Sequence, residues 1–166
     1  ANMDTVTESA MAIALAHAGG IGIIHRFMSI EEQVEEVSKV KRNVGVILSA
    51  PYTIMPDTKL FKVWDMSQTY TIDSFIVVDT NKKVVGILCK RDYMFEENKD
   101  RRVVDLMTPL KNLIYGKANM PIIEAKRIFQ KNKIEKLPLL SKDGQLKGLI
   151  TAKSIINYEK FPYSTK

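Results

Sequence analysis

Residues 77–92 read VVDTNKKVVGILCKRD, and residues 139–154 read LLSKDGQLKGLITAKS. The two stretches align without a gap when the chain is shifted by 62 residues, so that Gly86 falls on Gly148 and the flanking apolar pairs coincide. An internal repeat of this kind predicts similar structural copies that pack against each other. We therefore expect residues 46–158 to form one pseudo-symmetric unit of two copies.

Each copy is predicted to run helix, strand, turn, strand, helix. Residues 80–83 and 141–145 carry hairpin-turn chemistry, including Asp143 followed by Gly144. The helices before the two hairpins carry apolar residues at helical spacing: Leu60, Val63, Trp64 and Met66 in one, and Ile122, Ile123, Ala125, Ile128 and Phe129 in the other. A copy of about 50 residues buries too little surface to be stable alone, which favours pairing of the two.

The first 45 residues have a different pattern. Residues 5–8 and 29–32 each fit a capping box, which predicts one helix to about Ala18 and another with an apolar stripe to Val44. Gly19 can end the first helix in the left-handed conformation. The apolar run 21–24 predicts a short strand buried on both faces, and a helix–strand–helix order belongs to a parallel β/α fold.

The bulk composition limits the classes of partner. The chain has 166 residues, a net charge of +6 and a pI of about 9.3, but its lysines are dispersed, so a solvated surface is favoured over a nucleic-acid site. No apolar run approaches the ~18 residues of a membrane span, so no membrane partner is expected. Cys89 is the single cysteine and can form no internal disulfide. We expect a cytoplasmic protein and, because the chain opens on Ala1 within an apparent strand end, a fragment of a longer one.

The repeat resembles the cystathionine-β-synthase (CBS) module, whose signature is Gly, apolar residues, Ser or Thr, two variable residues and Asp. Residues 86–92 and 148–154 stand in that place. Residues 107–109, Met-Thr-Pro, resemble the usual module entry, and residues 134–138 resemble the segment before the second-copy strand. The resemblance implies a CBS domain at 46–97, another at 103–158, and binding of regulatory adenine or guanine nucleotides.

The front of the chain is similar to the IMP dehydrogenase / GMP reductase family. The resemblance rests on residues 1–8 (ANMDTVTE), 11–14 (MAIA), 19–22 (GGIG) and the pair Ile24–His25. It implies that residues 1–45 are a fragment of a (β/α)8 catalytic barrel, that the CBS pair is inserted there, and that residues 159–166 return toward the barrel. The expected fold class is therefore α/β: a partial TIM-barrel segment followed by a tandem CBS pair with pseudo-twofold symmetry.

For the parent protein, membership of this family implies NAD-dependent oxidation of IMP to XMP, a potassium ion, and a homo-oligomer that is a tetramer or an octamer. No catalytic residue is expected in this chain, because nothing in it matches the family's cysteine loop. Met3 would border the IMP pocket, with a core methionine as the alternative. His25 would border the dinucleotide site or be a buried structural histidine. A GMP reductase and a free-standing CBS pair remain open as alternatives.

For the regulatory nucleotide, the resemblance points to the residues at each strand–helix junction. Asp92 stands at the ribose-binding position, where a carboxylate could accept two hydrogen bonds from the diol, or it could simply stabilise a helix start. Cys89 departs from the usual hydroxyl and is expected to be a structural thiol rather than a nucleophile. In the second copy Thr151 supplies the hydroxyl, but Ser154 replaces the acid.

Phosphates and base require further groups around these junctions. Basic side chains could pair with phosphates, although each alone is equally explained by solvation: Lys90, Arg91, Lys136 and Lys153. Apolar residues could form the slot for a purine ring: Ile54, Ile114 and Pro138. The two histidines show no spacing typical of a metal site.

Overall fold

The computed structural model describes residues 2–164, which adopt a mixed α/β fold with two four-stranded sheets. The chain divides into two compact units. Unit 1 comprises Ala1–Leu48, Lys126–Lys136 and Ile150–Lys166, and unit 2 comprises Ser49–Ala125 and Leu137–Leu149. The front of the chain therefore lies in unit 1, and most of the first repeat copy lies in unit 2.

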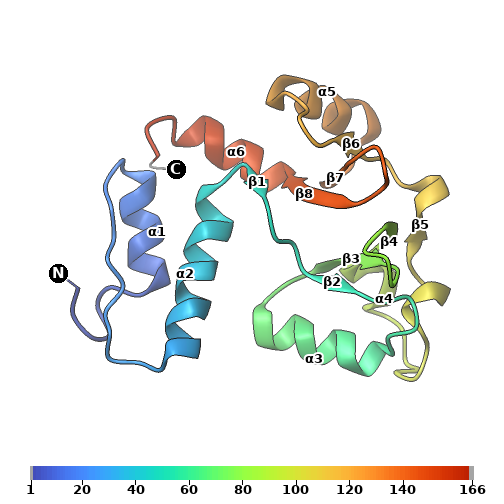
Figure 1. Cartoon of the computed structure of the whole chain (residues 1–166), viewed down its shortest axis with the longest axis horizontal. Coiled ribbons are helices and arrows are strands. Elements are labelled where there is room, and N and C mark those ends of the chain that lie inside the picture. The colour runs from blue at the N-terminus through green and yellow to red at the C-terminus, as the bar shows by residue number, and fades with distance from the viewer. Residues whose placement is uncertain (1, 165–166) are drawn as a thin grey trace. The chain divides into compact units, whose positions relative to one another are not determined.

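The front of unit 1 is a pair of helices lying side by side, α1 (Ser9–His17) and α2 (Ile30–Val44) (Figure 1). The predicted capping box of α2 is confirmed, since Ser29 N–H donates to Glu32 Oε2 at 2.8 Å and Glu32 N–H donates to Ser29 Oγ at 3.2 Å. The predicted end of α1 is also confirmed, because Gly19 has φ +82° directly after its C-cap residue.

The other predicted capping box, Thr5–Glu8, is wrong. Helix α1 begins at Ser9 with Glu8 as the N-cap residue, whose side chain makes no capping bond. The acceptor comes instead from α2, since Ser9 N–H donates to Glu36 Oε2 at 2.6 Å. A tertiary contact has thus replaced the local cap, and Thr5 lies in a turn at φ +57°.

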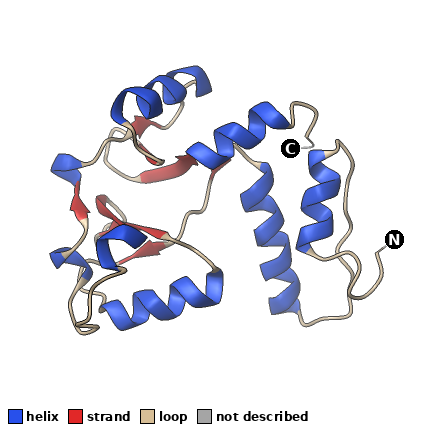
Figure 2. Ribbon diagram, turned by 180° about the vertical axis from the view of Figure 1, so that it is seen from behind, coloured by secondary structure: helices blue, strands red, loops and turns tan. Residues whose placement is uncertain are grey.

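The predicted strand 21–24 is also wrong. This stretch forms no strand, and Figure 2 shows the chain between α1 and α2 as a continuous loop. Ile21 is 80 % and Ile23 64 % exposed. A strand needs a neighbour to satisfy its backbone N–H and C=O groups, and within residues 2–164 no segment pairs with this one.

The predicted repeat is confirmed in the secondary structure. The first copy contains β2 (Thr53–Ile54), α3 (Leu60–Tyr70), β3 (Ser74–Val78), β4 (Val84–Cys89) and α4 (Lys90–Tyr93). The second contains β6 (Gly116–Lys117), α5 (Ile122–Asn132), β7 (Lys136–Leu140), β8 (Leu146–Thr151) and α6 (Ala152–Lys160). The bounds of α3, β3 and β4 recur 62 residues later in α5, β7 and β8.

The backbone repeats in detail as well. Thr71 and its equivalent Lys133 both have φ +52°, and Lys82 at φ +60° corresponds to Gly144 at φ +79°. Each hairpin closes with the same bond, from Asp79 N–H to Lys83 O at 2.9 Å in one copy and from Ser141 N–H to Gln145 O at 2.9 Å in the other. Two different sequences therefore adopt the same local geometry.

The two sheets take their edge strands across the repeat. One sheet has the order β2-β3-β4-β5, in which β5 (Thr108–Pro109) immediately precedes the second copy. The other has the order β1-β8-β7-β6, in which β1 (Ile47–Leu48) precedes the first copy yet lies beside β8. The hairpin tips also meet within unit 2, where Val84 N–H donates to Gly144 O at 3.0 Å.

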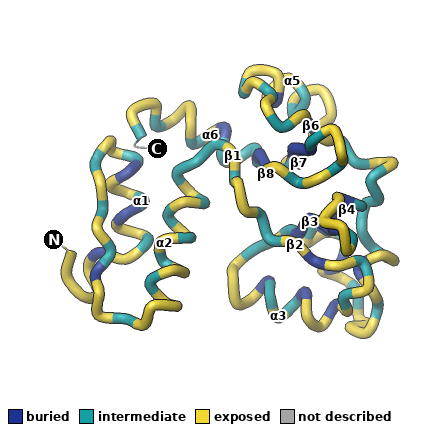
Figure 3. The backbone as a smooth tube through the Cα atoms, viewed as in Figure 1, coloured by how far each residue is buried: buried dark blue, intermediate teal, exposed yellow. Residues whose placement is uncertain are grey.

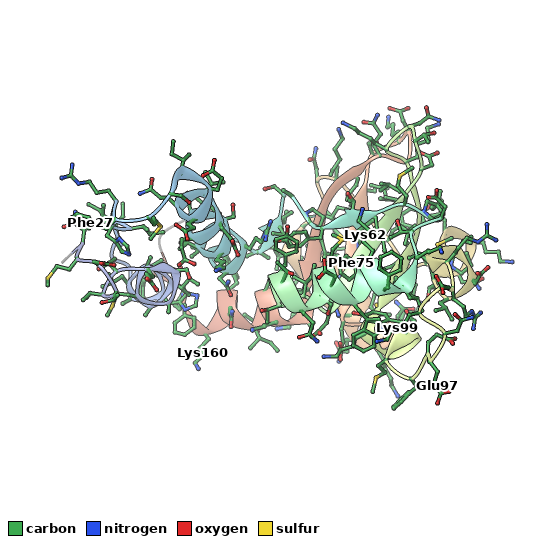
Figure 4. All side chains as sticks on the ribbon, turned by 90° about the horizontal axis from the view of Figure 1, so that it is seen from below. Phe27, Lys62, Phe75, Glu97, Lys99 and Lys160 are labelled. Atoms are coloured by element: carbon green, nitrogen blue, oxygen red, sulfur yellow. The ribbon has the colours of Figure 1, made fainter. Side chains whose placement is uncertain are left out.

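The core of unit 2 forms between α3 and the β2-β3-β4-β5 sheet. Its buried members are Ile54, Leu60, Val63, Phe75, Val77, Leu88, Tyr93 and Val103. Phe75 lies beside α3 in Figure 4 and is fully buried. Strand β5 approaches Gly86 so closely that a Cβ there would lie 2.5 Å from Thr108 O, so only glycine fits at this position. Two short 3₁₀ turns, Val103–Asp105 and Leu110–Asn112, flank β5.

The expected linker between the copies, residues 96–102, is anchored to the first copy. Leu60 N–H donates to Arg101 O and Phe61 N–H donates to Lys99 O, each at 2.9 Å. These bonds satisfy the first amides of α3, whose N-cap residue Lys59 makes no side-chain capping bond. The segment is therefore structural as well as connecting.

Candidate functional site

The predicted nucleotide-binding residues gather at two strand–helix junctions, one in each repeat copy. The first junction, Cys89–Asp92, joins β4 to α4 in unit 2. The second, Thr151–Ser154, joins β8 to α6 in unit 1. Both are capping boxes, in which the first residue is the N-cap and the fourth bonds back to it.

At the first junction Asp92 serves as the helix-start carboxylate. Its Oδ2 accepts the Cys89 N–H at 2.7 Å, and its side chain is 17 % exposed. Its other oxygen, Oδ1, lies 3.8 Å from Nε of Arg91. Because the capping bond uses one oxygen, Oδ1 is the atom that could receive a ligand hydroxyl.

Two cationic side chains lie beside that carboxylate. Arg91 is 78 % exposed, and Lys90 places Nζ 3.2 Å from Asp73 Oδ1. The Lys90 N–H also donates to Asp73 O at 2.7 Å, which fixes the start of α4. Exposed Arg and Lys groups at a helix start are suited to phosphate oxygens.

Helix α4 is held by Tyr93, whose ring is fully buried and lies edge-on to Trp64 with centroids 5.3 Å apart. Burial raises the pKa of the Tyr93 hydroxyl, partly offset by its hydrogen bond to Ser67 Oγ at 3.4 Å. The phenol is thus neutral and acts as an anchor, so Asp92 is presented from a rigid turn.

Sequence reasoning missed Ser74 at this junction. Ser74 pairs with Cys89 across the β3–β4 ladder, which puts the two side chains on the same face. Its Oγ is buried and has no hydrogen-bond partner in the described structure. The hairpin register could have revealed it, because residues equidistant from the turn face each other.

At the second junction both hydroxyls are already engaged. Thr151 Oγ1 accepts from Ser154 N–H at 3.0 Å, and Ser154 Oγ accepts from Thr151 N–H at 3.1 Å. The Ser154 hydroxyl also lies 2.9 Å from Val46 O as a donor. Lys153 is exposed and Lys136, the first residue of β7, is half-buried.

The remaining candidates lie elsewhere. Met3 is 58 % exposed and lies outside any strand. His25 is buried, as its structural interpretation predicts. Cys89 is half-buried at the N-cap of α4, which agrees with a structural thiol. Of the predicted purine slot, Ile54 belongs to the core and Pro138 is buried, so these two side chains fill the interior rather than line an open slot.

Within residues 2–164, no group of three or more His, Cys, Asp or Glu side chains is arranged to hold a metal ion. In the same range no helix has the length and apolar character required to cross a bilayer. A surface hollow in unit 2 is lined by Trp64, Asp65, Gln68, Glu96 and Lys99, and Lys99 is visible in Figure 4. None of the predicted site residues lines it.

Comparison with known proteins gives a consistent answer along the whole chain. The model of the IMP dehydrogenase / GMP reductase domain family matches residues 1–160. The inosine-5'-monophosphate dehydrogenases of Nitrosopumilus maritimus and Halalkalibacterium halodurans are each 45 % identical over 166 residues, and that of Staphylococcus aureus is 45 % identical over 168. The match covers 100 % of this chain and 34 % of each relative, so the chain spans about a third of their length.

Solved structures of GMP reductase from Trypanosoma brucei have the same arrangement. The complex with guanosine 5'-triphosphate matches with a TM-score of 0.86 and 30 % identity over 98 % of this chain and 40 % of that one. The C318A variant with guanosine 5'-monophosphate matches with a TM-score of 0.86 and 29 % identity, over 99 % of this chain and 35 % of that one.

Proposed function

The chain belongs to the IMP dehydrogenase / GMP reductase family, and from that premise we propose that it is part of an NAD-dependent IMP dehydrogenase, which oxidises IMP to XMP. The observation that carries this proposal is the 45 % identity to named IMP dehydrogenases over the full chain. The chain alone should be inactive, because nothing in it matches the family's cysteine loop.

In this proposal residues 1–45 form one edge of the parent's catalytic barrel. The exposed apolar side chains of that segment support the idea, because large exposed apolar surfaces mark contact regions. They include Ile21, Ile23, Phe27, Ile30 and Val34, and Figure 3 shows α2 without a buried residue. Met3 would border the IMP pocket. NAD supplies the hydride acceptor when bound, and both its site and the ligands of a potassium ion would come mainly from the rest of the parent.

A GMP reductase is the second candidate, favoured by the 0.86 TM-score to the trypanosomal enzyme. The natural polypeptide that carries this sequence decides between them. An IMP dehydrogenase should reduce NAD when IMP is added, whereas a GMP reductase should consume a reduced nicotinamide cofactor when GMP is added. Turnover of neither substrate would contradict both enzyme proposals and favour a free-standing regulatory pair.

We also propose that residues 46–97 and 103–158 are tandem CBS domains that bind regulatory purine nucleotides. The recurrence of α3, β3 and β4 after 62 residues supports this, as do the exchanged edge strands. The proposed effect of the nucleotide is on assembly of a cytoplasmic homo-oligomer, a tetramer or an octamer. Two similar structures are described as GTP and GMP complexes, which makes guanine nucleotides the first ligands to try.

The first junction is the stronger nucleotide site in this proposal. Asp92 Oδ1 would accept a ribose hydroxyl, Ser74 Oγ would gain a partner, and Lys90 and Arg91 would reach the phosphates. The second junction, with Thr151, Lys153 and Lys136, would contribute less, because Ser154 is neutral and already bonded to Val46.

Calorimetric titration of the chain with ATP, GTP and AMP tests the sensor proposal. Replacing Asp92 with Ala should weaken binding by about 1–3 kcal/mol if the carboxylate holds the ribose. Asp143→Ala, in the exposed turn of the second hairpin, is the matched control and should leave affinity unchanged. Absence of heat with all three nucleotides from a folded sample would contradict the proposal.

A further inference from the structure

His25 has an unusual environment for a structural histidine. It is 2 % exposed, and its Nε2 has no hydrogen-bond partner in the described structure. Two carboxylates face that nitrogen, Asp4 Oδ1 at 3.6 Å and Glu8 Oε1 at 3.6 Å. Buried polar atoms are normally satisfied, so an orphan aimed between two acceptors requires an explanation.

The protonation of the ring follows from its other nitrogen. Phe27, labelled in Figure 4 at the end of the loop before α2, donates its backbone N–H to Nδ1 of His25 at 3.1 Å. Nδ1 is therefore an acceptor, and in the neutral ring the proton lies on Nε2. Nε2–H is a donor directed at Asp4 and Glu8, and in this tautomer it cannot bind a metal ion.

The backbone of His25 is held on both sides. Its N–H donates to Thr7 O at 3.3 Å, and its carbonyl accepts from Gln33 Nε2 of α2 at 3.0 Å. The ring therefore has a fixed position relative to the turn that contains Thr7. Closing either 3.6 Å gap to a hydrogen bond would require the exposed carboxylate to move by less than ~1 Å.

The turn that faces His25 contains a strained residue. Met3 O accepts from both Val6 N–H at 3.2 Å and Thr7 N–H at 3.1 Å. Thr5 at the apex has φ +57°, an unfavourable region for a β-branched residue. Strain of this kind persists only where the surroundings impose it. Asp4 and Glu8 lie on either side of Thr5, so a single donor that attracts both carboxylates would hold the turn closed.

We propose that His25 is a positioning residue, whose Nε2–H holds Asp4 and Glu8 together and fixes the turn that presents Met3. This inference rests on the proposed function in one respect, namely that Met3 borders the substrate pocket. His25 does not touch the reacting atoms in this proposal. It acts through the turn, and α2 holds His25 in place through Gln33.

The tautomer can be tested on the chain itself. Long-range proton–nitrogen correlation spectra at neutral pH should show His25 with the proton on Nε2 and Nδ1 as acceptor. His17, stacked on Phe161 with ring centroids 4.2 Å apart, is the internal reference. A proton found on Nδ1 of His25 would overturn the proposal.

The mechanical role can be tested by amide hydrogen exchange at Val6 and Thr7. His25→Leu should speed exchange of both amides about tenfold, because the donor is lost while the volume is kept. His25→Gln, which keeps a donor near the Nε2 position, should stay within about threefold of the natural chain. His17→Gln is the control and should leave both amides unchanged.

Should His25→Leu unfold the segment, as judged by the α1 amides, Asp4→Asn combined with Glu8→Gln provides the second probe. These exposed side chains can be changed without opening the core, and the double variant should also speed exchange at Val6 and Thr7. Unchanged exchange in the double variant would contradict the clamp.

Kinetics of the natural polypeptide that carries this sequence separate the two proposals. His25→Leu should raise KM for IMP about tenfold with a smaller change in kcat, and His25→Gln should restore much of it. A looser turn with an unchanged KM would overturn the positioning role and leave the proposed enzyme intact. A closed, Nε2–H-clamped turn in a polypeptide that does not turn over IMP would reject the proposed enzyme only.

Discussion

The two strand–helix junctions have the same backbone and different side chains. Cys89 and Asp92 cap α4, and Thr151 and Ser154 cap α6, with a back-bond of 2.7 Å in the first and 3.1 Å in the second. Even the following amide repeats, from Lys90 to Asp73 O at 2.7 Å and from Ala152 to Glu135 O at 2.9 Å. A neutral serine therefore suffices for this fold, and the carboxylate of Asp92 exceeds what the turn requires. That excess is the reason for assigning ligand binding to the first copy.

The largest test of the comparison asks whether the copies are energetically one unit. Phe75 and its repeat equivalent Leu137 are both fully buried. Phe75→Ala should cost about 3–5 kcal/mol and Leu137→Ala about 2–5 kcal/mol of unfolding free energy. Because each sheet takes an edge strand from the other side of the repeat, both variants should still unfold in one transition in urea. Two separated transitions would show that the copies are independent.

A second test compares Asp92 with Glu36, the carboxylate that receives the first amide of α1. Burial alone would raise the pKa of Glu36, but hydrogen bonds from Lys39 and Ser9 lower it further, from 4.5 to about 2. The folded protein thus holds the charged form, so this stabilisation is complete above pH 5 and is lost as the pH falls toward 2. Glu36→Gln should cost about 2–3 kcal/mol at pH 7 and much less at pH 3 in urea titrations. An equal cost at both values would contradict this assignment.

Exchanging the two caps sharpens the comparison, because the exchange should be asymmetric. Ser154→Asp should destabilise the chain by about 1–3 kcal/mol, since a carboxylate cannot donate to Val46 O at 2.9 Å. Asp92→Ser should change unfolding free energy by less than about 0.5 kcal/mol and still weaken any nucleotide bound at the first junction. Thermal denaturation together with calorimetry measures both effects. Equal destabilisation by the two exchanges would mean that Asp92 has a mainly structural role.

The smallest expected effect concerns the hairpin turns. Lys82 adopts φ +60° where the second copy has Gly144 at φ +79°. Lys82→Gly should stabilise the folded state by up to about 1 kcal/mol, because glycine enters the left-handed region without strain, less the entropy it adds to the unfolded chain. Gly144→Lys should do the reverse. Chemical denaturation of the two variants checks the signs, and the same sign for both would show that the turns are not equivalent.

The sequence predicted what depends on local chemistry. The repeat, both hairpins, the Ser29 cap and the glycine that ends α1 all follow from spacing and turn residues within a few positions of one another. It failed where a distant group decides the structure. Glu36 displaces the expected Thr5 cap, and the apolar run at residues 21–24 has no strand beside it within residues 2–164.

The candidate site was predictable to the same extent. Asp92, Thr151 and their neighbours were found from the pattern around the repeated glycine. Ser74 was not, because its importance depends on strand register and on a hydroxyl left without a partner. The role proposed for His25 depends likewise on two carboxylates converging in space, and no spacing rule in the sequence encodes that convergence.

The exchanged edge strands also bear on how such a chain could have arisen. Strand β1 lies before the first copy but pairs with the second copy's sheet, while β5 pairs with the first. A polypeptide with one copy would therefore carry an edge strand that its own sheet does not use, together with an open edge, and unpaired edges recruit strands from other molecules. Two such polypeptides would complete each other by trading edges. Gene duplication followed by fusion would then turn that dimer into one continuous chain without creating any new strand pairing.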